Sequence, residues 1–155
     1  MLVYMKVSGI TDVGQDPRPG WIWLTDCSFG FYRKEVSAGG TDDSAQTEIR
    51  AAAKALKLTK SADRSSAALI SWMSTAEPRD VSIEFCVRPD LPQVEFKLKR
   101  ARLRNYEAQI TSDKDTAGVK ETLTVDYEEI SIDYWQQGST NEDADMNWFE
   151  LKLGA

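Results

Sequence analysis

The stretch from residue 54 to residue 85 constrains the fold most, because its side-chain pattern changes period twice. Leu56 and Leu58 alternate with polar residues, which is typical of a half-buried strand. Apolar residues then recur at helical spacing over residues 66–75, and Pro78 ends that helix because proline lacks a backbone donor. Alternation returns after the proline. The pattern therefore predicts one short helix between strands, where its apolar face can cover an open end or edge of a sheet.

The rest of the chain is patterned for strands. At 155 residues and 41% hydrophobic, it is long enough for one domain with a sizeable core. We predict a single domain over residues 1–155, with a polar linker over 136–145 that precedes a C-terminal edge strand over 146–153. The other predicted strands cover residues 2–7, 21–36, 47–58, 81–86, 93–112 and 121–135.

Two of these strands change phase along their length. In residues 93–112 the apolar positions shift register after Leu98 and again after Leu103, and in residues 121–135 they shift at Glu128. Because side chains alternate between faces, each shift requires an extra residue, which is a β-bulge. Bulged long strands allow a sheet to curl. The predicted fold is therefore mainly β, a closed or strongly curled antiparallel β-barrel or sandwich with one short flanking α-helix over residues 66–75.

The composition argues against catalysis. Histidine is absent, which removes the commonest general base and zinc ligand. Cys27 and Cys86 are far apart, and we favour free thiols over a disulfide. Acidic pairs such as Asp42-Asp43 lack the spacing of a calcium loop, and surface positions explain them better. We predict that the protein is no enzyme and has no cofactor and no metal site.

The sharpest charge feature is the basic segment over residues 97–104. It could hold nucleic acid, but the following strand carries Asp126, Glu128, Glu129 and Asp133, so a hairpin would set cations opposite anions. We favour these ion pairs, because a net charge of −6 also repels phosphate backbones. We expect no nucleic-acid partner. No apolar run is long enough for membrane insertion, and the first ten residues lack a basic region, so we expect no secretory signal and folding in the cytoplasm.

Five tryptophans leave a carbohydrate-binding alternative open, because sugar rings stack on exposed aromatic rings. Trp72 belongs to the apolar face of the predicted helix and is expected in the core. The other four lie on or beside predicted strands. A monomeric carbohydrate-binding β-domain is therefore the alternative from a different functional class.

Residues 59–69 read Thr-Lys-Ser-Ala-Asp-Arg-Ser-Ser-Ala-Ala-Leu, and this motif resembles the Hcp family, the tube proteins of bacterial type VI secretion systems. Asp63, Ser65, Ser66 and Leu69 match the family pattern in order. Residues 121–125 lead to residues 130–134, which look like the penultimate strand of the family, and residues 147–151 resemble its closing strand. Ala67 stands where the family usually has proline, which is a local departure.

The resemblance implies a specific assembly. Hcp proteins form hexameric rings that stack into a hollow tube inside a contractile sheath, and the lumen can carry effector proteins. It implies self-association as the main partnership, together with sheath, tip and effector proteins. It also implies synthesis in the bacterial cytoplasm followed by secretion through the type VI machine without a signal peptide. A tail-tube protein of another phage-like contractile machine is the nearest alternative.

Residues 37–46 contain little that can be buried and predict a long polar loop. By analogy with the family, this loop is the candidate for stacking between rings, since a polar loop that becomes ordered on contact suits reversible assembly. The candidate stacking residues are Ser37, Gly39, Gly40, Thr41, Asp42, Asp43 and Ser44.

Overall fold

The computed structural model describes residues 1–13, 18–37, 47–115, 117–135 and 147–152, which form strands and a single short helix. The predicted mainly-β class is confirmed. The helix α1 covers Ser66–Met73. The strands are β1 (Leu2–Val7), β2 (Ile22–Leu24), β3 (Asp26–Ser28), β4 (Phe31–Ser37), β5 (Thr47–Ala53), β6 (Leu56–Ser61), β7 (Arg79–Arg88), β8 (Leu91–Thr111), β9 (Gly118–Asp126), β10 (Glu129–Tyr134) and β11 (Asn147–Lys152).

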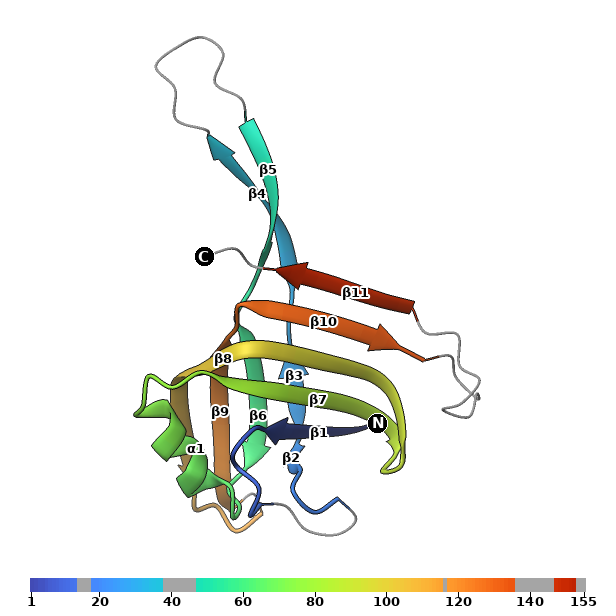
Figure 1. The fold of residues 1–155 in the computed structure, drawn as a ribbon. Helices are drawn as coiled ribbons and strands as arrows, with labels where there is room; N and C mark the ends of the chain where they lie inside the picture. The colour runs from blue at the N-terminus through green and yellow to red at the C-terminus, as the bar shows by residue number, and fades with distance from the viewer. Residues whose placement is uncertain (14–17, 38–46, 116, 136–146, 153–155) are drawn as a thin grey trace.

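Nine strands form one antiparallel sheet in which β8 connects two arms (Figure 1). The order is β2-β1-β7-β8-β9-β6-β3, and β10 pairs with β8 on one side and β11 on the other. The first half of the 21-residue β8 lies between β7 and β10, whereas its second half pairs with β9. We call β2, β1, β7, β10, β11 and the first half of β8 the first arm, and the second half of β8 with β9, β6 and β3 the second arm. In Figure 1 the strands of the first arm run across β6 and β9 of the second. Strands that pass from one such arm to the other commonly do so at bulges.

Two of the register shifts lie where the sequence predicts them. The register between β7 and β8 shifts between Arg79 and Val81, opposite Arg100, whose φ of 53° is left-handed. The register between β8 and β9 shifts between Leu103 and Asn105. These irregularities match the two phase changes of the apolar pattern. The third predicted shift, at Glu128, is a break between β9 and β10 rather than a bulge within one strand.

The predicted closed or strongly curled barrel is not confirmed. The hydrogen-bonded path begins at β2 and ends at β3 without returning on itself. These two strands are consecutive in the chain, but β2 pairs with β1 and β3 pairs with β6. Thr25 separates them, and its backbone N–H donates to the Thr59 carbonyl at 2.8 Å. The segment predicted as one strand over residues 21–36 is thus divided into β2, β3 and β4 because its parts serve different partners.

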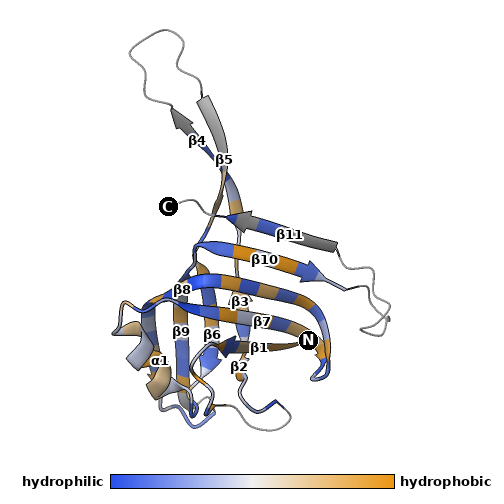
Figure 2. Cartoon of the chain, in the orientation of Figure 1, coloured by the Kyte–Doolittle hydropathy of each residue, from blue (hydrophilic) through white to orange (hydrophobic). Residues whose placement is uncertain are grey.

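The core lies between the two arms, with α1 at one end (Figure 1). Apolar and polar residues alternate along the strands of the first arm, as Figure 2 shows for β8 and β10. The helix buries Leu69 and Trp72, and the Trp72 Nε1–H donates to the Glu77 carbonyl at 3.0 Å. The expected core position of Trp72 is confirmed. At eight residues, α1 is too short to cross a membrane, and the described chain holds no helix that could.

The strands β4 and β5 form a separate two-stranded hairpin that projects from the body (Figure 1). Their register runs from Phe31 opposite Ala53 to Ser37 opposite Thr47. The run of alanines over residues 51–53 therefore lies in a strand, as predicted, although alanine by itself favours helix. Pairing along the whole of β4 outweighs that preference.

Candidate functional site: the helix-docking network and the assembly surfaces

The four residues that match the family motif meet at the start of α1. Asp63 Oδ1 accepts hydrogen bonds from the Ser65 backbone N–H, at 2.8 Å, and from the Ser65 hydroxyl. The Ser66 hydroxyl donates to Glu121 on β9, and Leu69 is fully buried. Ser65 is the N-cap residue, but its hydroxyl bonds to Asp63 instead of capping the helix backbone. These residues attach the helix to the sheet.

Lys60 is the centre of this network. Its side chain is 0% exposed, and its Nζ donates to the Ser61 carbonyl at 2.9 Å, to Asp63 Oδ1 at 2.9 Å and to Glu121 Oε2 at 3.1 Å. An ammonium group has three protons, so these three acceptors satisfy it completely. Lys60 and Glu121 are direct cross-strand partners on β6 and β9, and Glu121 is only 1% exposed. The pair joins β6, β9 and α1.

The network lowers the pKa of Asp63. Burial raises this pKa, but hydrogen bonds from Ser65 and Lys60, together with the Lys60 charge, lower it by more, so that it lies below its ordinary value of 3.8. Burial raises the pKa of Tyr106 on β8, and the nearby charge of Glu121 raises it further. The electrostatics therefore hold Asp63 ionised and Tyr106 neutral near neutral pH.

The sequence analysis missed Lys60 and Glu121 as partners. A signal was present, because Lys60 is in phase with the buried Leu56 and Leu58, and Glu121 is in phase with the buried Leu123. Charged residues are nevertheless almost never fully buried unless they are paired, so the default assignment places them in solvent. Only the register of β6 with β9 shows that the two occupy opposite positions.

The first of the candidate stacking residues lies on the projecting hairpin. Ser37 is the last residue of β4, so it lies in a strand and not in a loop as predicted. Arg33, Lys34 and Glu35 on the hairpin are exposed. The remaining candidate stacking residues, Gly39, Gly40, Thr41, Asp42, Asp43 and Ser44, lie outside the described residues. Their role in stacking stays a prediction.

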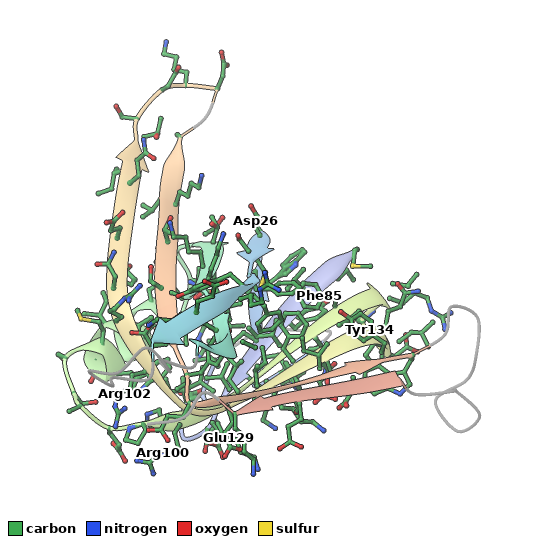
Figure 3. All side chains as sticks on the ribbon, turned by 90° about the horizontal axis from the view of Figure 1, so that it is seen from above. Asp26, Phe85, Arg100, Arg102, Glu129 and Tyr134 are labelled. Atoms are coloured by element: carbon green, nitrogen blue, oxygen red, sulfur yellow. The ribbon has the colours of Figure 1, made fainter. Side chains whose placement is uncertain are left out.

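The basic segment of β8 pairs with acidic residues across the sheet, as predicted. The pairs join Lys97 to Asp133 at 3.5 Å, Lys99 to Glu129 at 4.0 Å, Arg100 to Glu128 at 2.9 Å and Arg104 to Asp126 at 3.4 Å. We call this set the charge ladder. Arg100 and Glu129 lie on the outer side of the sheet (Figure 3). The cations of this segment are thus neutralised within the subunit.

The comparisons with known proteins identify the family. The family model described as "Type VI secretion system effector, Hcp" matches residues 4–134, from β1 through β10. The chain belongs to the Hcp family. Curated protein sequences gave no significant match.

Solved structures of Hcp and type VI secretion proteins share the fold. A type six secretion system protein is 19% identical with a TM-score of 0.75, and the alignment covers 98% of this chain and 95% of that one. A type VI secretion system effector from Yersinia pestis is 12% identical with a TM-score of 0.72, covering 97% and 98%. Hcp1 from Salmonella typhimurium is 12% identical with a TM-score of 0.71, covering 96% and 93%. At these identities the likeness concerns the fold.

The remaining candidate groups of this Hcp chain do not form a reactive centre among the described residues. Burial raises the pKa of Cys27 to about 12, and burial together with the charge of Glu84 raises that of Cys86 to about 11, so both are thiols at neutral pH. Neither is in a disulfide. The described residues contain no group of three metal-ligating side chains. Trp72 is buried, whereas Trp23 is 62% exposed, so the tryptophans do not share one environment.

Proposed function

We propose that this protein is a structural, non-catalytic subunit of the inner tube of a type VI secretion system, and that residues 1–155 act as one unit. Six copies form a ring, the rings stack into a hollow tube, and the lumen carries effectors. The observation that supports this most is the match of the Hcp family model over residues 4–134, together with a fold shared along nearly the whole chain.

The shape of the subunit supports stacking. The β4–β5 hairpin, whose register ends at Ser37 opposite Thr47, projects from the two arms (Figure 1). The end of such a hairpin can contact a neighbouring ring without changing the body of the subunit. We propose that Ser37 and the following candidate residues contribute to that contact.

The partners and the route follow from the same role. We propose that the protein folds in the bacterial cytoplasm, that it is surrounded by a contractile sheath and contacts a tip protein, and that it leaves the cell through the type VI machine. The paired cations of the charge ladder support the expectation that nucleic acid is not a partner, because they are already neutralised by carboxylates.

Negative-stain imaging combined with light scattering over a range of concentrations tests the proposal. Closed rings of six subunits, and stacks of them, are the expected result. A variant in which residues 38–46 are shortened to a tight turn should still form rings but should not stack. The matched control replaces the same residues with a Gly/Ser loop of equal length, which separates loop length from loop sequence. A protein that stays monomeric at every concentration would contradict the proposal.

A further inference from the structure

Three carboxylates lie in a row across the middle of the first arm. Glu84 on β7 is opposite Glu95 on β8, and Glu95 is opposite Asp133 on β10. The three strands lie side by side (Figure 1), and directly opposite residues point to the same face of a sheet. We call these three residues the carboxylate row. Like charges that face each other in this way destabilise a sheet, so the row requires an explanation.

The carboxylate row is mostly shielded from water. The side chains of Glu84, Glu95 and Asp133 are 13%, 17% and 14% exposed. Arg100 in the charge ladder, by contrast, is 59% exposed. Solvent and salt screen partly buried charges much less than exposed ones. The repulsion within the row is therefore felt more strongly than any repulsion on the open surface.

Among the described residues, two cations serve these three carboxylates. Arg18 pairs with Glu84. Lys97 is shared, because its Nζ is 3.5 Å from the nearer Asp133 oxygen and 3.8 Å from that of Glu95. When all three carboxyls are ionised, this group of five side chains carries one uncompensated negative charge.

The geometry selects Glu95 as the group that binds a proton. It lies between the other two carboxylates, so one proton at Glu95 removes both repulsions. A proton on Glu84 would instead leave Arg18 unpaired, and a proton on Asp133 would remove the shorter contact of Lys97. Burial raises the pKa of Glu95 above its ordinary value of 4.5, and the charges of Glu84 and Asp133 raise it further, although the two cations oppose this.

Two other titratable side chains face the row and do not compete for this proton. Tyr4 on β1 is opposite Glu84, and the Cys86 Sγ lies 3.6 Å from Arg18 Nη1. Burial raises the pKa of Tyr4 and raises that of Cys86 to about 11, so both are neutral in acidic and in neutral solution. A change of charge in this pH range therefore falls on the carboxylate row.

We propose that Glu95 is a proton switch within the first arm. When protonated, its carboxyl donates a hydrogen bond to a flanking carboxylate of the row and so joins β8 to a neighbouring strand. When ionised, it adds a third negative charge to the row and weakens the association of β7, β8 and β10. The first arm is consequently held more tightly in mildly acidic than in neutral surroundings.

The raised pKa of Glu95 determines the direction of the pH dependence. Below pH 4.5 the unfolded chain also binds this proton, so the contribution of Glu95 to stability is fully present. Above pH 4.5 the unfolded chain releases the proton more readily than the folded protein, and the contribution is lost as the pH rises through the folded pKa. The pKa of Asp63 lies below 3.8, so the helix-docking network responds in a separate range.

The switch acts within one subunit and does not require assembly. If the protein leaves the cell as proposed above, it gains stability wherever the surroundings are mildly acidic, and only this consequence rests on the proposed function. Imaging of rings at the same pH values tests the proposed function separately. A failure to form rings would leave the switch untouched.

Glu95→Gln tests the switch, because the amide is neutral at every pH and still donates a hydrogen bond. Urea denaturation is followed at neutral pH and below pH 4.5, in a dilute solution in which light scattering detects no rings. We expect the variant to unfold at a higher urea concentration than the wild type at neutral pH, and this difference to shrink below pH 4.5. A variant no more stable than the wild type at neutral pH, or a difference that does not change with pH, would overturn the proposal.

Glu107→Gln is the matched control. Glu107 is an exposed glutamate of the same strand, and the amide retains an oxygen that can accept the hydrogen bond from Asn105. We expect this variant to follow the wild type at both pH values. A gain in stability equal to that of Glu95→Gln would show that the effect comes from net charge rather than from the carboxylate row, and it would contradict the switch.

NMR titration of the side-chain carboxyls gives an answer even if Glu95→Gln fails to fold. In the wild type the carboxyl of Glu95 should titrate with a midpoint above pH 4.5. Lys97→Gln should move this midpoint to a still higher pH, because it removes a cation that favours the ionised form. A wild-type midpoint at or below 4.5, or a midpoint that Lys97→Gln leaves unchanged, would refute the assignment of the proton to Glu95.

Discussion

The protein contains two sets of ion pairs that differ in burial rather than in distance. The charged nitrogen and oxygen atoms of Lys60 and Glu121 are 3.1 Å apart, and the two side chains are 0% and 1% exposed. Those of Arg100 and Glu128 are 2.9 Å apart, but the two side chains are 59% and 46% exposed. An exposed pair is screened by water and contributes little, but breaking a buried pair leaves an uncompensated charge. The comparison shows that short distances alone do not identify the pairs on which the fold depends.

The buried pair should give the largest effect. Lys60→Met leaves Glu121 buried without its cation, and we expect a loss of roughly 3–5 kcal/mol in the free energy of unfolding. Urea denaturation measures this loss. Lys57→Met is the matched control, because Lys57 is exposed on the opposite face of β6. The double variant Lys60→Met/Glu121→Leu should recover much of the loss. An equal effect of Lys57→Met and Lys60→Met would contradict the argument.

The hydroxyl of Ser66 should give an intermediate effect. Ser66→Ala removes the hydrogen bond to Glu121 and leaves one carboxylate oxygen partly unsatisfied, for which we expect a loss of about 1–3 kcal/mol. Ser71→Ala, at an exposed position of the same helix, is the control and should cost much less. If the two variants unfold at the same denaturant concentration, the hydroxyl has no role in docking the helix.

The network should also produce an acid dependence of stability. The pKa of Asp63 in the folded protein lies below its ordinary value of 3.8, so ionised Asp63 stabilises the fold fully above pH 3.8. This contribution is lost as the pH falls from there through the folded pKa. Asp63→Asn should therefore lower stability at neutral pH and reduce the slope of stability against pH in that acidic range. Thermal melts across the range measure both effects. If the stability of the wild type and of Asp63→Asn depends on pH in the same way, this role of Asp63 is refuted.

The charge ladder should give the smallest effect. Glu128→Gln removes the partner of Arg100 and Arg102, and we expect a loss of about 0.2–1 kcal/mol that decreases further as salt is added. Urea denaturation at low and high ionic strength measures this. A salt-independent loss as large as that of Lys60→Met would remove the distinction between the two sets of pairs.

Alternation along a strand made much of this structure predictable. The two phase changes in residues 93–112 located the bulges, and the order of charges predicted the ladder, because both depend on local spacing. The open sheet was not predictable, since it depends on Thr25 separating two strands that pair with distant partners. The Lys60–Glu121 pair was missed for a related reason: the two residues are 61 positions apart, and only the register between β6 and β9 brings them together.

The arrangement around β8 has a consequence for the rate of folding. Short connections join β8 to β7 and to β9, so these ladders close at a low cost in chain entropy, whereas pairing β1 with β7 closes a much longer loop. Contacts that are local in sequence generally form early. We expect Leu98→Ala on β8 to slow folding, and Ile22→Ala on β2 mainly to accelerate unfolding, in stopped-flow measurements. The strand that connects the two arms would thereby also determine how quickly the chain reaches its native state.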